Sequence, residues 1–272
     1  MRAEADRPRR NRGRTALIAL ALVVATVTLV VPLALIFVSA FADGAAAYVR
    51  NVTAPDMLHA VFLTVLTAVI VVPVNMVFGI ATAWAVARYE FPGRKLMISL
   101  IEIPFSVSPI VAGTIYLFLY GQQGLLGPTL QSWGVQIMFS VPAIVLVSLF
   151  VTAPFVAREL IPLMQAQGSE DEEAALSLGA SPWQTFRLVT LPNIRWALLY
   201  GSLLTNARAM SEFGAVSVVS GSIRGQTNTL PLHIELLYND FNIAGAFAAA
   251  SMLALIAVAT LGIKYLMEAR AA

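Results

Sequence analysis

Six long apolar runs constrain what this chain can fold into more than any other feature of its sequence. They cover approximately residues 15–39, 59–87, 96–120, 137–157, 196–220 and 244–267. A helix that crosses a bilayer needs about 20 mostly apolar residues, because it rises about 1.5 Å per residue through a hydrocarbon core about 30 Å thick. Each run reaches that length, so we predict an all-α membrane protein with six transmembrane helices.

The composition favours the same fold class. Only 12% of the 272 residues are charged and 58% are hydrophobic, whereas soluble domains carry about 25% charged residues. The chain has no Cys, which excludes thiolate catalysis and Cys-ligated metal sites. The two histidines, His59 and His233, lie far apart in the sequence without a carboxylate cluster beside them. We therefore expect no metal site.

Lys and Arg are distributed unevenly among the loops, which predicts the orientation of the helices. With six spans, fourteen of the 17 basic residues fall on one side, and only Arg50 and Arg224 fall on the other. We expect both termini to be cytoplasmic, with residues 1–14 as a basic cytoplasmic tail. An uncleaved first span is favoured over a signal peptide, whose apolar core has about 7–15 residues. A tail that adjoins a span also favours a membrane anchor over a nucleic-acid-binding patch.

A polar segment, residues 158–195, separates the fourth and fifth runs and falls on the cytoplasmic side. Ser169 and Glu172 have the spacing of a capping box. The four consecutive carboxylates of residues 170–173 suit the positive end of a helix dipole. Gly179 can end this first helix in the left-handed conformation.

A second short helix follows in the same polar segment. Ser181 is expected as its N-cap with Pro182 at its first position, and Leu191-Pro192 is expected to close it. A long polar, helical segment in so apolar a chain indicates contact with a soluble partner. From the caps alone, a solvated helical loop is an equal alternative.

The spacing within the polar segment resembles the signature loop of importer-type ABC transporter permeases. That signature is E-A-A, three residues, G, nine residues, an aliphatic residue, one residue and L-P. Its anchors in this chain are Glu173, Ala174, Ala175, Gly179, Val189, Leu191 and Pro192. In that family the loop forms coupling helices that dock into a cleft of an ATPase subunit. The resemblance implies an ATPase-coupling role for Glu173, Ala174, Ala175, Gly179, Leu191 and Pro192.

Further segments are similar to the sulfate/thiosulfate group within this family. They are residues 54–60, 73–75, 91–94, 193–201 and 220–225. The resemblance implies a type I importer permease (MetI-like) fold over residues 15–268, in a bacterial inner membrane. It also implies four partners: an ABC ATPase dimer, a second homologous permease, a periplasmic sulfate- or thiosulfate-binding protein, and membrane lipid. Molybdate and tungstate permeases are similar around the fifth run, so these oxyanions are the alternative cargo.

Ionisable residues within the fifth run are candidates for the translocation pathway. Arg208 and Glu212 lie four residues apart on one helical face and can pair. Charges at membrane depth are costly and usually face a bundle interior or a watery path, so the pair serves either the pathway or helix packing. Outside the membrane, Ser220, Ser222 and Arg224 could meet the oxyanion or the binding protein, although a solvated arginine is the simpler interpretation.

The sequence has no GxxxxGK[ST] phosphate-binding loop. We therefore expect ATP and Mg²⁺ to be bound by the partner ATPase, and this chain to be a transport subunit with no cofactor and no catalytic site. An ion-coupled secondary transporter would predict paired repeats with broken helices, and no internal repeat is found. An intramembrane enzyme would need a nucleophile with a nearby base, which the sequence does not provide.

Overall fold

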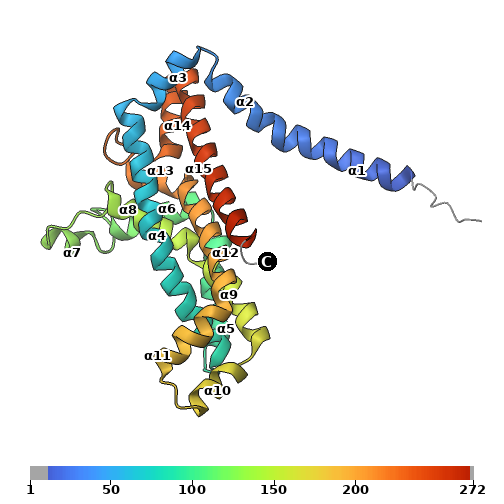
Figure 1. The fold of residues 1–272 in the computed structure, drawn as a ribbon. Helices are drawn as coiled ribbons and strands as arrows, with labels where there is room; N and C mark the ends of the chain where they lie inside the picture. Colours follow the sequence, from blue (N-terminus) through green and yellow to red (C-terminus); the bar gives the residue numbers. More distant parts are fainter. Residues whose placement is uncertain (1–11, 270–272) are drawn as a thin grey trace, which may run out of the picture.

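Residues 12–269 are described by the computed structural model, and every regular element in that range is a helix (Figure 1). The first half holds α1 (Arg12–Ala25), the π-helical turn η1 (Thr26–Val30), α2 (Val31–Ala40), α3 (Ala45–Val52), α4 (Pro55–Arg88), α5 (Arg94–Ser106), α6 (Pro109–Tyr120), α7 (Gly127–Ser132) and α8 (Val141–Thr152). The second half holds α9 (Pro154–Gln167), α10 (Glu170–Ser177), α11 (Pro182–Thr185), the π-helical turn η2 (Phe186–Thr190), α12 (Leu191–Met210), α13 (Gly214–Ser220), α14 (Leu230–Asn239) and α15 (Ile243–Ala269). The all-α prediction is confirmed. Residues 1–11 of the expected basic tail lie outside the described residues.

Four helical stretches among the described residues are long and apolar enough to cross a membrane. They are Gly13–Ala40, Pro55–Arg88, Val141–Gln167 and Ile243–Thr260. The pair of α5 and α6 reaches the same criterion only when the two bent helices are taken as one span. The described chain therefore supports four or five spans, where the sequence predicts six.

Two of the predicted runs are broken. α5 and α6 are bent by 108° at the break between them. Pro109 biases the residue before it toward extended backbone, and Ser108 has that conformation with ψ of 136°. The fifth run divides at residues 211–213 into α12 and α13. Broken backbone at membrane depth must lie against protein or water, so both breaks favour the interior of a bundle.

Both π-helical turns precede a proline that is the second residue of the next helix. In η2 the N–H of Leu191 donates to the carbonyl of Phe186, five residues earlier, and Pro192 follows. η1 has the same relation to Pro32. A proline ring clashes with the carbonyl four residues before it, and a widened turn relieves that clash. The prediction that Leu191-Pro192 closes a helix is therefore wrong, since α11, η2 and α12 are continuous.

α4 is the central helix of the bundle. Its buried residues recur every three or four positions from Met57 to Val86, a spacing that places them on one face of the helix. α4 packs along both α9 and α12, and those two helices pack on each other. These three helices form the core to which the polar segment is attached.

Glycines bring the three core helices close together around Val156 of α9. A Cβ on Gly79 of α4 would lie 2.5 Å from the Val156 Cβ, and a Cβ on Gly201 of α12 would lie 3.0 Å from the Val156 Cα. Small residues allow such close approach between membrane helices. The core is therefore held by close fit of shape.

An amide side chain supports the break between α8 and α9. Pro154 has no N–H, and the N–H of Ala153 donates to the carbonyl of Phe150 in a tightened turn. Asn75 of α4 donates to the carbonyl of Leu149 at 3.4 Å and to Thr152 Oγ1 at 2.7 Å. Neighbouring side chains commonly serve carbonyls near a proline in this way in membrane helices.

The remaining helices differ in how closely they pack on the bundle. α13 packs on α6 and α8, while α15 packs on α14, α2 and α3. In Figure 1, α10 and α11 lie at one end of the molecule, α3 and α14 lie toward the other, and α1 extends away from the bundle. The most apolar window of Gly13–Ala40 is not buried within the described chain. That surface is suited to lipid or to a second protein.

Candidate functional site

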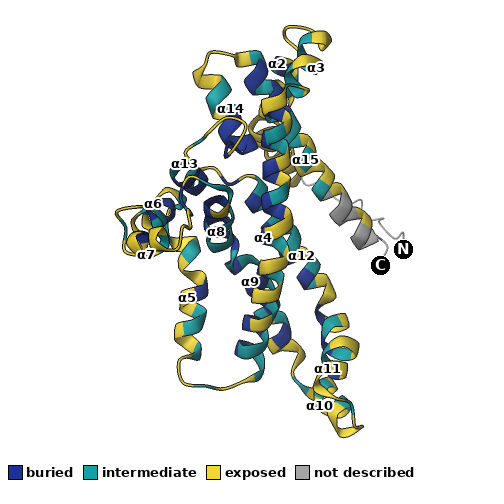
Figure 2. Ribbon diagram, turned by 90° about the vertical axis from the view of Figure 1, so that its left-hand side faces the viewer, coloured by how far each residue is buried: buried dark blue, intermediate teal, exposed yellow. Residues whose placement is uncertain are grey.

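The polar segment presents apolar side chains at the end of the molecule. None of the eight described residues of α10 is buried, and this helix is mostly exposed in Figure 2. Leu178, directly after α10, is 90% exposed, and Leu176, Trp183 and Leu188 are exposed as well. Apolar side chains gathered on a projecting segment are typical of a surface that contacts another protein.

Gly179 ends α10 as the sequence predicts. Its φ is +89°, its N–H donates to the carbonyl of Leu176, and the N–H of Ala180 donates to the carbonyl of Ala175. This pair of hydrogen bonds is the Schellman motif. A Cβ on Gly179 would meet nothing within 4 Å among the described residues, so the requirement for glycine here is one of backbone conformation.

The start of α11 is also confirmed, with one addition. Ser181 is the N-cap and Pro182 the first helical residue. Gln184 completes a capping box that the sequence analysis did not predict, because its Oε1 accepts from the N–H of Ser181 while its own N–H donates to Ser181 Oγ. The turn from α10 to α11 is thus fixed on both sides.

The capping box predicted for Ser169 and Glu172 is wrong. Ser169 Oγ donates instead to the carboxylate of Glu173, with 2.5 Å between the oxygens. Glu172 turns toward Arg88 at the end of α4, since a bidentate guanidinium is a stronger partner for a carboxylate than a neutral backbone N–H. The glutamate of the signature, Glu173, thereby takes part in the start of α10.

Arg88 and Glu172 form the centre of a polar cluster beneath α10. Arg88 Nε donates to Glu172 Oε2 at 2.8 Å, and Arg88 Nη2 donates to Glu172 Oε1 at 3.2 Å. Thr190 of η2 donates to Glu172 Oε1 at 2.7 Å, and Arg88 Nη1 donates to the carbonyl of Met164 at 2.7 Å. The two charged side chains are 10% and 12% exposed. Their geometry is that of a shielded, charge-assisted pair.

A second, more exposed contact joins α10 to α12. Asn193 Nδ2 donates to Asp171 Oδ2 at 3.2 Å. The other signature residues lie nearby in sequence but differ in burial: Glu173, Ala174 and Pro192 are exposed, and Ala175 and Leu191 are half-buried. The acidic first turn of α10 therefore has two functions in the structure, a favourable position at the helix N-terminus and attachment to the core.

Arg208 and Glu212 pair as predicted, at the break between α12 and α13. Arg208 Nη1 lies 2.6 Å from Glu212 Oε2, and the two side chains are 31% and 1% exposed. Glu212 Oε1 also accepts from the N–H of Ala215 in the first turn of α13 at 2.8 Å. The buried carboxylate thus caps one helix while it binds the last turn of the other. The arginine is the member of the pair that reaches solvent.

The loop after α13 is held by its own hydrogen bonds. Thr227 Oγ1 donates to the carbonyl of Ser220 at 2.6 Å and accepts from the N–H of Ile223. Ser220 Oγ accepts from the N–H of Ser222 at 3.1 Å, and Ser222 has a positive φ of 50°. The candidate hydroxyl of Ser220 is therefore buried in the turn.

Arg224 is paired with a carboxylate. Its Nη2 contacts Asp240 Oδ2 just after α14, and both side chains are about half exposed. Ser222 and Arg224 line a shallow pocket beside α14, together with Glu235. Arg224 is exposed to solvent, as the simpler interpretation expects, and it also has an ion-pair partner within the chain.

A buried histidine lies next to this loop on α14. His233 is 4% exposed, and its Nδ1 is 3.2 Å from Asn228 Nδ2. Burial lowers the pKa of His233, Asp56 opposes this and Arg224 adds to it. The neutral ring can accept from the Asn228 amide, which a protonated ring could not do.

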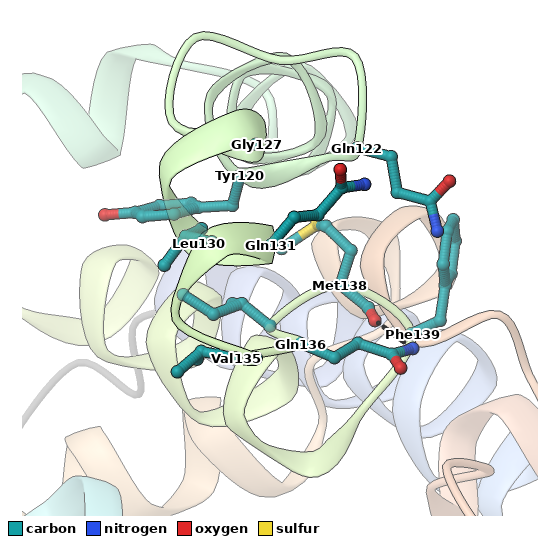
Figure 3. Close-up of a pocket in the computed structure, with 11 residues that line it drawn as sticks. Tyr120, Gln122, Gly127, Leu130, Gln131, Val135, Gln136, Met138 and Phe139 are labelled. Carbon is teal, nitrogen blue, oxygen red and sulfur yellow. Dashed lines mark hydrogen bonds between the residues drawn. The ribbon is translucent and has the colours of Figure 1, made fainter.

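A cavity lies in the loop region around α7 (Figure 3). Its volume is about 260 Å³, and three glutamine side chains, Gln122, Gln131 and Gln136, line it beside Phe139. Phe139 has a positive φ of 59°, and its N–H donates to the carbonyl of Val219. Within residues 12–269 no three His, Asp or Glu side chains gather as a metal site.

Arg88 and Thr190 are the site residues that the sequence analysis missed. Arg88 counted only as a basic residue that sets orientation, and Thr190 lies between two signature positions. Two features of the sequence could have indicated this ion pair. One is an arginine at the end of the longest span, and the other is a run of four carboxylates in the next cytoplasmic segment. Sequence alone does not show which carboxylate would meet it.

Comparison with known proteins gives three findings. A family model for the "Binding-protein-dependent transport system inner membrane component" matches residues 75–272. The chain is 57% identical over 260 residues to the "Sulfate transport system permease protein CysW" of Escherichia coli (strain K12), covering 96% of this chain and 89% of that protein. The protein of the same name from Synechocystis sp. is 50% identical over 263 residues, covering 97% and 95%.

Solved structures share the fold at lower identity. A bacterial ABC transporter involved in the import of the acidic polysaccharide alginate matches with a TM-score of 0.80 and 16% identity, covering 96% of each chain. A second structure of a bacterial alginate ABC transporter, in complex with an alginate pentasaccharide-bound periplasmic protein, matches with the same TM-score and identity, covering 96% and 95%. At this identity the likeness concerns the fold alone.

Proposed function

Because this chain belongs to the family of binding-protein-dependent transport system inner membrane components, we propose that it is the permease subunit of an ATP-driven importer for sulfate or thiosulfate. The cargo follows from the relatives named as sulfate permeases, which match nearly the whole chain. The transporter consists of this chain, a second homologous permease and an ATPase dimer that binds ATP and Mg²⁺. A periplasmic binding protein delivers the oxyanion, in keeping with the periplasmic protein in one structural relative.

The exposed apolar surface on the polar segment is the observation that carries the coupling role. Leu178 is almost fully exposed beside the Schellman turn at Gly179, and α10 is attached by its carboxylates rather than by buried apolar side chains. This leaves Ala174, Ala175 and the leucines available to an ATPase subunit. Closure of the ATPase dimer pushes on α10 and α11 and turns the bundle from inward-facing to outward-facing.

Orientation and span number complete the proposal. Residues 15–268 form a six-helix domain in which α12 and α13 together supply the fifth span, with the termini and the polar segment in the cytoplasm. The residues proposed to line or support the oxyanion pathway are Arg208, Glu212, Ser220, Ser222 and Arg224, of which Glu212 and Ser220 are buried in this structure. Arg208 is the strongest of these, because its guanidinium is partly exposed at a helix break. At Arg224 an oxyanion would compete with Asp240.

A pair of exposed leucines tests the coupling role. Leu178→Arg places a charge on the proposed docking surface, whereas Leu125→Arg alters a leucine that is 81% exposed in the loop after α6. In the assembled transporter we expect Leu178→Arg to lower ATPase-subunit retention and sulfate uptake at least about tenfold, since charges in the apolar centre of an interface are strongly disfavoured. Leu125→Arg should retain both. Equal effects of the two variants would contradict the assignment.

Molybdate or tungstate is the alternative cargo. The test is competition of sulfate, thiosulfate, molybdate and tungstate for uptake of labelled sulfate by the complete transporter. Strong inhibition by thiosulfate, with weak inhibition by molybdate and tungstate, is expected for the proposed cargo. The reverse order would reassign the substrate and leave the ATPase-coupling role intact.

A further inference from the structure

We propose that Arg88 and Glu172 are positioning residues that transmit movement of α10 to α4 during transport. This inference rests on the proposed function, because it assumes that an ATPase subunit moves α10. It concerns a pair outside the family signature, whose first residue is Glu173.

α10 is attached to the core by polar contacts. Its eight described residues include no buried side chain, whereas α9, which directly precedes it, buries five residues. α10 packs mainly against η2 and α11, which belong to the same polar segment. Its side-chain hydrogen bonds to the bundle helices join Glu172 to Arg88 and Asp171 to Asn193. A push on α10 therefore reaches α4 through the Glu172 carboxylate.

Four elements meet at this one pair. Arg88 is the last residue of α4, and Glu172 lies in the first turn of α10. Thr190 of η2 donates to the same carboxylate at 2.7 Å. Met164 contributes one of the last carbonyls of α9, a position without a helical donor, and it accepts from Arg88 Nη1 at 2.7 Å. Displacement of Glu172 is thereby opposed by the ends of α4, α9 and η2 together.

The geometry favours a stiff connection. Two parallel hydrogen bonds of 2.8 and 3.2 Å fix the orientation of the guanidinium as well as its distance. Both side chains are about nine-tenths buried, so salt screens them less than an exposed pair. Arginine supplies three donors in one plane here, which a lysine cannot reproduce. α4 then carries the displacement along the whole bundle, because one face of it is buried from Met57 to Val86.

The chain offers a matched control pair in the adjoining loop. Glu90, two residues after α4, and Arg94, the first residue of α5, have the same charges, but they are 3.8 Å apart and Glu90 is 96% exposed. Neutralising this pair removes the same charges from the same end of the molecule. Exposed pairs of this kind contribute little to stability.

The experiment measures sulfate uptake and ATP hydrolysis by the complete transporter, with its binding protein, in proteoliposomes. The variants are Arg88→Gln, Glu172→Gln, the double variant, and Glu90→Gln/Arg94→Gln. We expect both single variants to retain the ATPase subunit and to transport at least roughly fivefold less sulfate per ATP hydrolysed than wild type, the lower end of a typical coupling free energy. The double variant should be no worse than either single variant, because the two residues act as one unit. The control pair should match wild type.

An unchanged ratio of sulfate to ATP in both single variants would overturn the inference, even if both rates fell, since a merely structural contact lowers uptake and hydrolysis in proportion. If the glutamine variants do not assemble, Arg88→Lys and Glu172→Asp keep the charges and lose the bidentate geometry. A lowered ratio in these supports the inference and a wild-type ratio overturns it. Failure of Leu178→Arg to weaken ATPase retention is a separate result, which contradicts the proposed coupling role itself.

Discussion

α9 and α10 are consecutive helices, yet they are held in opposite ways. α9 buries five residues against α4 and α12 and fits between two glycines at Val156. α10 buries none of its described residues and is bound through two carboxylates. Close packing is sensitive to the volume of each side chain, whereas a helix held by ion pairs is sensitive to the loss of a charged partner. The core around α9 is therefore held by close packing, and α10 is held by polar contacts that leave the apolar side chains around it exposed.

The largest effect is expected where the close packing is disturbed. Gly79→Leu places a side chain where even a Cβ would lie 2.5 Å from the Val156 Cβ. We expect a loss of about 3 kcal/mol or failure to fold, because overpacked cores force backbone shifts. Thermal unfolding in detergent measures it. Val156→Ala should partly restore stability in the double variant, and Gly262→Leu is the control, since a Cβ there meets nothing within 4 Å among the described residues.

A charge inside the bundle gives the next largest effect and tests whether shape alone holds it. Arg208→Gln leaves the buried Glu212 carboxylate without its ion-pair partner, so we expect a loss of about 2 kcal/mol. Adding Glu212→Gln should recover part of it, because a neutral amide oxygen can still accept from Ala215. Denaturant unfolding of both variants decides this. Equal stability of Arg208→Gln and wild type would mean that the break at residues 211–213 does not depend on the pair.

A smaller effect is expected from pH at the end of the bundle remote from α10. Burial lowers the pKa of His233, so the unfolded chain binds more protons than the folded chain as the pH falls through about 6.5. Stability should therefore be full above that pH and be lost on acidification. The temperature at which wild type unfolds should decrease when the pH is lowered from about 7.5 to about 5.5. His233→Gln should lose this dependence and His59→Gln should keep it; an unchanged slope in His233→Gln would assign the dependence to other groups.

The smallest effect on stability is expected on the exposed surface of the polar segment. Leu178→Arg should change the unfolding free energy of the isolated chain by no more than about 0.5 kcal/mol, because the side chain is 90% exposed. The same variant is expected to disrupt transport. A large loss of stability would show that Leu178 packs within the chain, and would weaken the contrast between α9 and α10.

The sequence predicted features that depend on local chemistry. The end of α10 at Gly179 and the start of α11 at Ser181 follow from backbone conformation and capping. The Arg208–Glu212 pair was indicated by its four-residue spacing, although Glu212 lies just past the end of α12. The bond between Arg88 and Glu172 joins residues 84 positions apart, so no local pattern could show it. The same long-range pairing explains the error at Ser169, because Glu172 was assigned to the nearest available donor.

The continuity of the helix through Leu191-Pro192 also escaped prediction, because proline usually ends a helix. The break in the fifth run was missed for a different reason. Gly214 and the buried Glu212 stabilise a bend within a run that is apolar enough to read as one helix. An apolar composition indicates that a run lies in the membrane, but it does not show whether the helix is continuous.

The π-helical turn η2 has a geometrical consequence for the polar segment. An α-helix turns by about 100° and rises about 1.5 Å with each residue, and η2 contains one residue more per turn than an α-helix would. Conversion of η2 to regular α-helix would therefore rotate α11 about the α12 axis by roughly 100°. Trp183, which stacks on Phe186, would then face a different direction. The direction in which the exposed apolar surface faces thus depends on the one additional residue in the π-helical turn before Pro192.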